Sequence, residues 1–287
     1  MIRGYFHPYL GEEAIAVGVC AALGSEDYIL STHRGHGHCI ARGASVDRMT
    51  AELLGKKSGY CKGLGGSMHI ADVESGNLGA NGVVGAGIPI AVGAALGSKI
   101  RNDNRVAVAF SSDGATCNGT FAESLSVAAM WDLPLIIVIE NNQYAVSTPI
   151  ESSARETDLY KRALGYGVVT SGVDGNDVWA VYEKAREAVS LCRNGKGPVV
   201  IEAKTYRHQG HHVNDPGTYM PKEKLEYYLK KDPVATGRKY LGEYLNEDEI
   251  KSIEQQIEKE MEAAVEFALS ADEMTPEEFF QNIQRYN

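Results

Sequence analysis

The stretch "RVAVAFSSDGATCNG", from Arg105 to Gly119, joins an apolar run to a turn of small residues that holds a single acid, Asp113. The run from Arg105 to Phe110 predicts a buried strand. Asp113 then falls at the carboxyl end of that strand. A lone carboxylate in this position is compatible with a helix cap, a surface turn or a cation ligand.

Short apolar runs alternate with helical stretches in the middle of the chain. After the turn we expect a helix from Thr120 to Trp131 and a second strand from Leu135 to Glu140. Further on we expect a helix over about 177–192 and a strand over 198–204. Strand–helix–strand alternation predicts parallel strands joined by right-handed crossovers. The fold class is therefore α/β, with a mostly parallel sheet flanked by helices.

Two other segments complete the expected organisation. The segment from Ile88 to Ile100 is apolar and rich in small residues, which predicts a buried helix close against the sheet. From about Tyr219 the sequence becomes charged and strongly helical, most clearly from Glu247 to Leu269. We therefore expect a main domain over residues 1–218, with residues 219–287 as a helical C-terminal extension of the same domain.

The composition excludes several function classes. The 287 residues include 28 Lys and Arg against 38 Asp and Glu, a formal net charge of −10. Nucleic acid is an unsuitable partner for such a chain, because phosphates are bound by clustered Lys and Arg. No run approaches the ~20 apolar residues of a spanning helix, and the first residues do not resemble a signal peptide. With five scattered cysteines and no paired metal spacing, we expect a cytoplasmic protein without disulfides or a membrane partner.

Asn142 closes the second predicted strand, 29 positions after Asp113. In a parallel sheet both residues reach the same carboxyl edge, where open α/β sheets bind ligands. A carboxylate and an amide oxygen suit Mg²⁺, and the start of the helix near Thr120 favours phosphate. The pattern fits a Mg²⁺–diphosphate site. Spacing alone, however, favours the plainer interpretation of a capping Asp113 and an Asn142 in an ordinary loop.

Six sequence blocks, which run through nearly the whole chain, favour the site over the plainer interpretation. In chain order they are "HPYLGEEA", "THRGHGHCIARG", "CKGLGGSMHI", "GANGVVGAGIPIAVGAALG", "ENNQYAVST" and "TYRHQGHHVNDPG". In content and order they resemble the alpha subunit of the thiamine diphosphate-dependent 2-oxo acid and acetoin dehydrogenase components. The resemblance implies the thiamine diphosphate-binding fold, with residues 1–218 as its diphosphate-binding domain.

The resemblance also implies two cofactors, thiamine diphosphate and Mg²⁺, and matches residues to roles. Asp113 and Asn142 match the Mg²⁺ ligands, and Tyr144 matches the residue whose backbone carbonyl completes the metal shell. The positions that match contacts to the diphosphate or the aminopyrimidine are His33, Arg34, Gly82, Val84, Gly114, Ala115 and His211.

Two histidines match catalytic positions. His211 matches the histidine beside the diphosphate and the reaction centre, where an imidazole moves protons or stabilises an oxyanion. His7 matches a histidine that faces the approaching substrate. The run "HRGHGH" also invites a zinc interpretation, which we set aside because no nearby cysteine or acid completes a ligand shell. We expect His36, in that run, to order its own loop.

The sequence departs from the family pattern at several positions. Ser112 replaces the glycine that usually precedes the metal aspartate, and Cys117 replaces the usual asparagine. His212 occupies the position of a serine that is phosphorylated in animal relatives, so that switch is absent. The version "STHRGHGHCIARG" is the one associated with acetoin dehydrogenases. Relatives carry a further helix before "GYFHPYLGEEA", so we expect a shorter N-terminal part here.

By resemblance, the chain is part of an oxidoreductase that decarboxylates a small 2-oxo acid such as pyruvate, or cleaves acetoin. The two-carbon unit then passes to the lipoyl group of an acyltransferase component. In this family the glutamate that activates the cofactor lies in a separate pyrimidine-binding domain, for which this chain has no room. We therefore expect a beta subunit to supply it in an α₂β₂ assembly. One alternative is a non-catalytic assembly subunit. The other is a Rossmann-type nucleotide-dependent oxidoreductase, which is disfavoured because no G-x-G-x-x-G follows a first strand in this chain.

Overall fold

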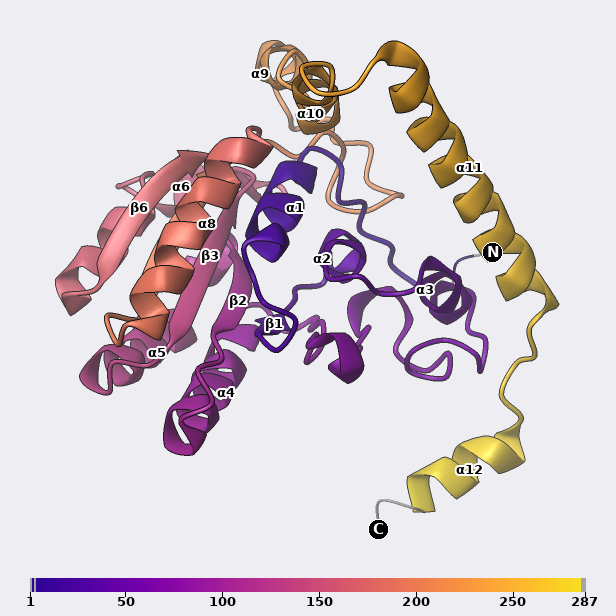
Figure 1. The fold of residues 1–287 in the computed structure, drawn as a ribbon, viewed down its shortest axis with the longest axis horizontal. Helices are drawn as coiled ribbons and strands as arrows, with labels where there is room; N and C mark the ends of the chain where they lie inside the picture. The colour runs from indigo at the N-terminus through magenta and orange to yellow at the C-terminus, as the bar shows by residue number, and fades with distance from the viewer. Residues whose placement is uncertain (1, 3, 285–287) are drawn as a thin grey trace.

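A parallel sheet forms the centre of the molecule. The computed structural model describes residue 2 and residues 4–284 (Figure 1). The strands of the sheet are β1 (Tyr28–Leu30), β2 (Ala107–Ser112), β3 (Leu135–Asn141), β6 (Val169–Asp174) and β7 (Val199–Lys204). Their order is β1–β2–β3–β7–β6, and every neighbouring pair is parallel, which confirms the expected α/β architecture. Two short strands, β4 (Tyr144–Ala145) and β5 (Thr148–Pro149), form a separate antiparallel pair.

Both faces of the sheet are covered by helices. Ala109 and Ile137 pack into the core on one face, while Val108 and Ile136 pack into the core on the other. Because the central strands are buried on both faces, their sequences are continuous apolar runs rather than alternating ones. The covering helices are α4 (Gly87–Arg101) and α5 (Gly119–Met130) on the first face, and α1 (Glu13–Ala21) and α8 (Val178–Arg193) on the second (Figure 1).

The expectation of a buried helix over 88–100 holds for only one face of α4. Ile88 and Ala91 pack against the sheet with no exposed surface. On the opposite side, Ile90 is 49% exposed and Ile100 is 76% exposed. The single chain therefore leaves an apolar face of α4 open.

The C-terminal extension is largely helical over residues 219–284, as the sequence predicts, and residues 285–287 lie outside the described part of the chain. The long helix α11 (Glu247–Ser270) packs along α3 (Val46–Leu53), far from it in sequence (Figure 1). The other α-helices are α2 (His36–Ala41), α6 (Ile150–Ser153), α7 (Tyr160–Ala163), α9 (Lys222–Leu229), α10 (Pro233–Leu241) and α12 (Pro276–Gln284). Short 3₁₀ helices span Gly66–Met68, Val73–Ser75, Gly114–Cys117 and Leu164–Tyr166.

All five cysteines are free thiols, as expected. Within the described part of the chain, no helix has the length and apolar character needed to cross a membrane.

Candidate functional site

The carboxyl ends of β2 and β3 form one side of a cavity of about 340 Å³. The two strands are parallel neighbours, so Asp113, just after β2, and Asn142, just after β3, reach the same edge of the sheet. This is the arrangement that the spacing in the sequence predicts. Of the predicted site residues, those that line the cavity are His7, His33, Arg34, Gly82, Val84, Gly114, Asn142, Tyr144 and His211.

Asp113 lies just behind the cavity wall and is 1% exposed. Its Oδ1 accepts a hydrogen bond from the Gly114 N–H at 2.9 Å, while its buried Oδ2 has no hydrogen-bond partner. Burial raises the pKa of the Asp113 carboxyl to about 6. Buried carboxylate oxygens are normally paired, so an unpaired one calls for an explanation, and a cation ligand provides it. The residues present therefore fit a Mg²⁺ site.

The turn around Asp113 tolerates the unusual serine. Ser112 is the last residue of β2, and its φ angle is not positive. Its hydroxyl accepts a hydrogen bond from the Ala115 N–H at 3.2 Å, so this amide is engaged within the turn. Gly114 is more constrained, because a Cβ there would lie 2.8 Å from the Cβ of Ala145. A glycine at 114 thus lets the turn and strand β4 approach each other closely.

Glu12 links two predicted site residues, although no sequence pattern pointed to it. One carboxylate oxygen of Glu12 accepts a hydrogen bond from Asn142 Nδ2 at 3.0 Å and lies 3.4 Å from Arg34 Nε. Burial raises the pKa of the Glu12 carboxyl to about 8, while the Arg34 charge acts in the opposite direction. An acid at the start of a helix is also typical of an ordinary helix N-terminus, which hides its role in the sequence.

Arg34 is held by the protein on several sides. Besides its ion pair with Glu12, its guanidinium donates hydrogen bonds to the carbonyl of Pro8 and, at 3.2 Å, to the carbonyl of His211. Arg34 therefore ties the N-terminal segment to the loop that carries His211. It also brings a buried positive charge to the cavity, where the predicted diphosphate contact requires one.

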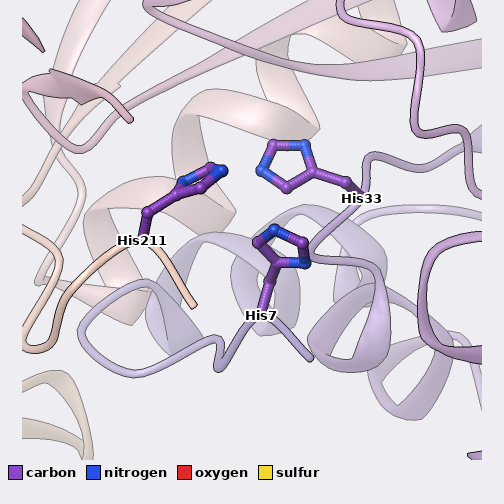
Figure 2. Close-up of side chains that lie close together, drawn as sticks. All are labelled: His7, His33 and His211. Carbon is purple, nitrogen blue, oxygen red and sulfur yellow. The ribbon is translucent and has the colours of Figure 1, made fainter. Parts of the chain in front are cut away.

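Three predicted residues, His7, His33 and His211, come together in the cavity (Figure 2). Their ring centroids lie 4.7–5.3 Å apart, and one ring nitrogen from each lies within 4.8 Å of the others. Burial, followed by the positive charge of Arg34, lowers the pKa of His7 to about 3, of His33 to about 2 and of His211 to about 4. All three rings are therefore neutral at pH 7.

The other histidines of "HRGHGH" point elsewhere. Nε2 of His36 lies 3.2 Å from the Ser67 hydroxyl, so this ring is linked to the glycine-rich segment 61–68 rather than only to its own loop. His38 is fully buried, with Nδ1 2.8 Å from the Ser31 hydroxyl and Nε2 3.0 Å from Glu140. Of the three, only His33 lines the cavity.

Arg207 is a second residue that the sequence analysis missed. It is buried beside the cavity, and its Nη1 lies 3.4 Å from Nδ1 of His211. Its Nη2 donates to the Tyr219 hydroxyl at 2.6 Å and to the Val146 carbonyl at 2.8 Å. One sequence feature could have pointed to Arg207. It is a basic residue soon after a predicted apolar strand, in the same sequence block as His211.

The described residues that line the cavity include no Asp and no Glu. At its margin, Val84 is 48% exposed and its neighbour Val83 is 66% exposed. The cavity thus offers imidazoles, arginines, an amide and apolar side chains, with the Asp113 carboxylate behind its wall.

Comparisons with known proteins show which proteins this chain is similar to. The chain is 47% identical over 269 residues to the alpha subunit of acetoin:2,6-dichlorophenolindophenol oxidoreductase from Bacillus subtilis, which covers 93% of this chain and 81% of the relative. Identity to the protein of the same name from Cupriavidus necator is 42%, over 98% of this chain and 86% of the relative. Identity to the pyruvate dehydrogenase E1 component subunit alpha of Rhizobium meliloti is 37%, over 98% and 82%. The dehydrogenase E1 component family model matches residues 1–277, and the chain therefore belongs to the dehydrogenase E1 component family.

Proposed function

We propose that this chain is the alpha subunit of a thiamine diphosphate-dependent oxidoreductase that cleaves a carbon–carbon bond beside a carbonyl group. The observation that carries the proposal is the buried, unpaired Oδ2 of Asp113, at the same sheet edge as Asn142. An oxygen pair of this kind suits Mg²⁺, which commonly binds through one or two protein ligands together with phosphate oxygens. Family membership supports the same cofactor.

The proposed role of each residue is the one that the family resemblance implies. Asp113, Asn142 and the backbone carbonyl of Tyr144 hold Mg²⁺, while Gly114 and Arg34 face the diphosphate. Other proposed cofactor contacts come from Gly82, Val84, Ala115 and His33. When bound, thiamine diphosphate supplies a nucleophilic carbon that attacks the substrate carbonyl.

The two proposed catalytic histidines act as neutral imidazoles. The low pKa values of His7 and His211 leave both rings uncharged at pH 7, with one nitrogen as a donor and the other as an acceptor. The donor nitrogen stabilises negative charge that develops on a substrate oxygen, and the acceptor nitrogen accepts a proton.

A beta subunit completes the proposed site in an α₂β₂ assembly. The described lining of the cavity contains no carboxylate side chain to activate the cofactor, and the apolar Val83 and Val84 stand exposed at its margin. We propose that the partner covers these residues and supplies the glutamate. A lipoyl acyltransferase component then accepts the product acyl group, and the complex works in the cytoplasm.

We propose acetoin as the substrate, with a 2-oxo acid such as pyruvate as the second candidate. The two relatives named for acetoin are 42–47% identical to this chain, whereas the pyruvate dehydrogenase alpha subunit of Rhizobium meliloti is 37% identical. His33, which lies in the cavity, belongs to the segment associated with acetoin dehydrogenases.

The metal site is tested by titrating thiamine diphosphate into the full chain, with and without Mg²⁺. Asp113→Asn keeps the shape of the side chain and removes its charge, so we expect Mg²⁺-dependent affinity to fall on the order of 30- to 100-fold. The control is Asp272→Asn, whose side chain is 78% exposed and does not line the cavity. Unchanged affinity in Asp113→Asn contradicts the proposed site.

The partner and the substrate are tested by reconstitution. The purified chain alone is expected to be inactive, and addition of the beta subunit should give cleavage of acetoin with an artificial electron acceptor. Faster turnover of pyruvate would select the second candidate. Full activity of the isolated chain would overturn the proposed division of the site between two subunits.

A further inference from the structure

We propose that His7, His33 and His211 form a second metal site in the cavity, one that binds a borderline divalent ion such as Zn²⁺. It is separate from the proposed Mg²⁺ site at Asp113 and Asn142. The inference begins from the convergence of three rings that lie far apart in the sequence (Figure 2).

The geometry of the rings is close to that of a three-histidine zinc site. Zinc binds imidazole nitrogens at about 2.0–2.1 Å in a tetrahedral shell, which places those nitrogens roughly 3.4 Å apart. One nitrogen from each of the three rings already lies within 4.8 Å of the others. All three residues lie outside the named helices and strands, so shifts of about 1 Å can close the shell. The fourth coordination position is left for water.

The rings have few competing partners. Within the described part of the chain, His33 makes no side-chain hydrogen bond, and Nδ1 of His7 is buried without one. His211 has one long contact, 3.4 Å from Nδ1 to Arg207 Nη1. Zinc bound at Nε2 of His211 would place the ring proton on Nδ1. Because Nδ1 could then no longer accept a hydrogen bond, the contact with Arg207 would break. Arg207 would keep its hydrogen bonds to Tyr219 and Val146.

The ligand chemistry separates the two metals. Imidazole nitrogen suits Zn²⁺, whereas Mg²⁺ takes oxygen ligands such as those of Asp113 and Asn142. The nearby arginines oppose any cation at the histidines. We therefore expect a weaker affinity than at a three-histidine site without arginines nearby.

Occupancy of the histidine site has a consequence that rests on the proposed function. The three rings and the residues proposed to hold thiamine diphosphate line the same cavity. A zinc ion that draws the rings together narrows this cavity, so we expect bound Zn²⁺ to weaken binding of the cofactor.

The test uses the untagged full chain, free of cofactor. Zn²⁺ is titrated by calorimetry, and Co²⁺ serves as a spectroscopic probe because tetrahedral coordination gives intense visible absorption. We expect one ion per chain, and we expect His33→Phe and His211→Phe each to weaken binding at least about tenfold and to abolish the Co²⁺ signal. His69→Gln is the matched control, since His69 is an exposed histidine outside the cluster and should leave both readouts unchanged.

The outcomes separate this inference from the proposed function. Zinc affinity that is unchanged in both phenylalanine variants, with folding confirmed by circular dichroism, overturns the site. Histidine-dependent zinc binding in a chain that does not bind thiamine diphosphate, with or without the beta subunit, supports the metal site and contradicts the proposed function. If both ligands bind, cofactor affinity should fall as Zn²⁺ is added, and unchanged affinity would contradict the predicted blockage.

Discussion

The Asp113 carboxylate lies just behind the cavity wall, and one of its oxygens has no hydrogen-bond donor. Removal from water raises its pKa to about 6, above the ordinary value of 3.8. Between about pH 4 and pH 6 the folded chain therefore retains a proton that the unfolded chain releases. Stability falls as the pH rises through this range, because the ionised group is disfavoured in the folded state.

We predict that Asp113→Asn stabilises the cofactor-free chain at pH 7, by about 1–3 kcal/mol in the free energy of unfolding. The gain should shrink as the pH falls from 6 towards 4, where the wild-type carboxyl is already protonated in the folded state. Urea unfolding at several pH values measures it, with Asp272→Asn as the exposed control. Destabilisation at pH 7 would show that the carboxylate has a compensating partner within the chain.

Individual residues also show how far the sequence could define the site. Asp113 and Asn142 could be placed together, because parallel strands bring their carboxyl ends to one edge. The effect of Ser112 could not be predicted, because it depends on a backbone angle and on the Ala115 amide. Glu12 escaped notice because its contacts with Asn142 and Arg34 join distant segments.

Among the elements, the glycine-rich segment is organised by one buried acid on α3. The Glu52 carboxylate accepts hydrogen bonds of 2.8–2.9 Å from backbone N–H groups of the segment. The same segment continues to Met68, which lines the cavity, and to Ser67, which contacts His36. The donors to Glu52 are the N–H groups of Cys61, Gly63, Gly65 and Gly66.

We predict that Glu52→Gln lowers the free energy of unfolding by about 2–4 kcal/mol. An amide has one accepting oxygen, so its NH₂ group would face backbone donors that are then left unpaired. Urea denaturation measures the loss. Glu258→Gln, on the exposed surface of α11, should change stability by less than about 0.5 kcal/mol. A similar small effect at Glu52 would contradict its organising role.

The elements themselves were the most predictable part of the fold. The apolar runs located β2, β3 and β7 to within about two residues, because strands buried on both faces are short, continuous apolar runs bounded by turn residues. The glycine-rich segment could not be predicted in this way, since its conformation depends on Glu52 rather than on a local pattern.

The whole chain is proposed to unfold as one domain. Helix α11 packs along α3, and α10 contacts α1, so the C-terminal extension is joined to the main domain at more than one place. Both tryptophans, Trp131 and Trp179, lie before residue 219, whereas the helical circular dichroism signal also includes the extension. The two signals therefore report different parts of the chain.

We predict that thermal unfolding followed by tryptophan fluorescence and by circular dichroism at 222 nm gives the same midpoint. Packing of α11 on α3 couples the two parts, so neither should melt alone. An earlier loss of helical signal would instead show that residues 219–287 form an independent unit. A chain that ends after residue 245 provides a comparison and should melt at a lower temperature by both probes.

The absence of Asp and Glu from the described cavity lining has a cellular consequence under the proposed function. A copy of this chain without its partner subunit leaves substrate untouched. The number of working centres is then set by the scarcer of the two gene products. Overproduction of this subunit alone should therefore leave metabolic flux unchanged.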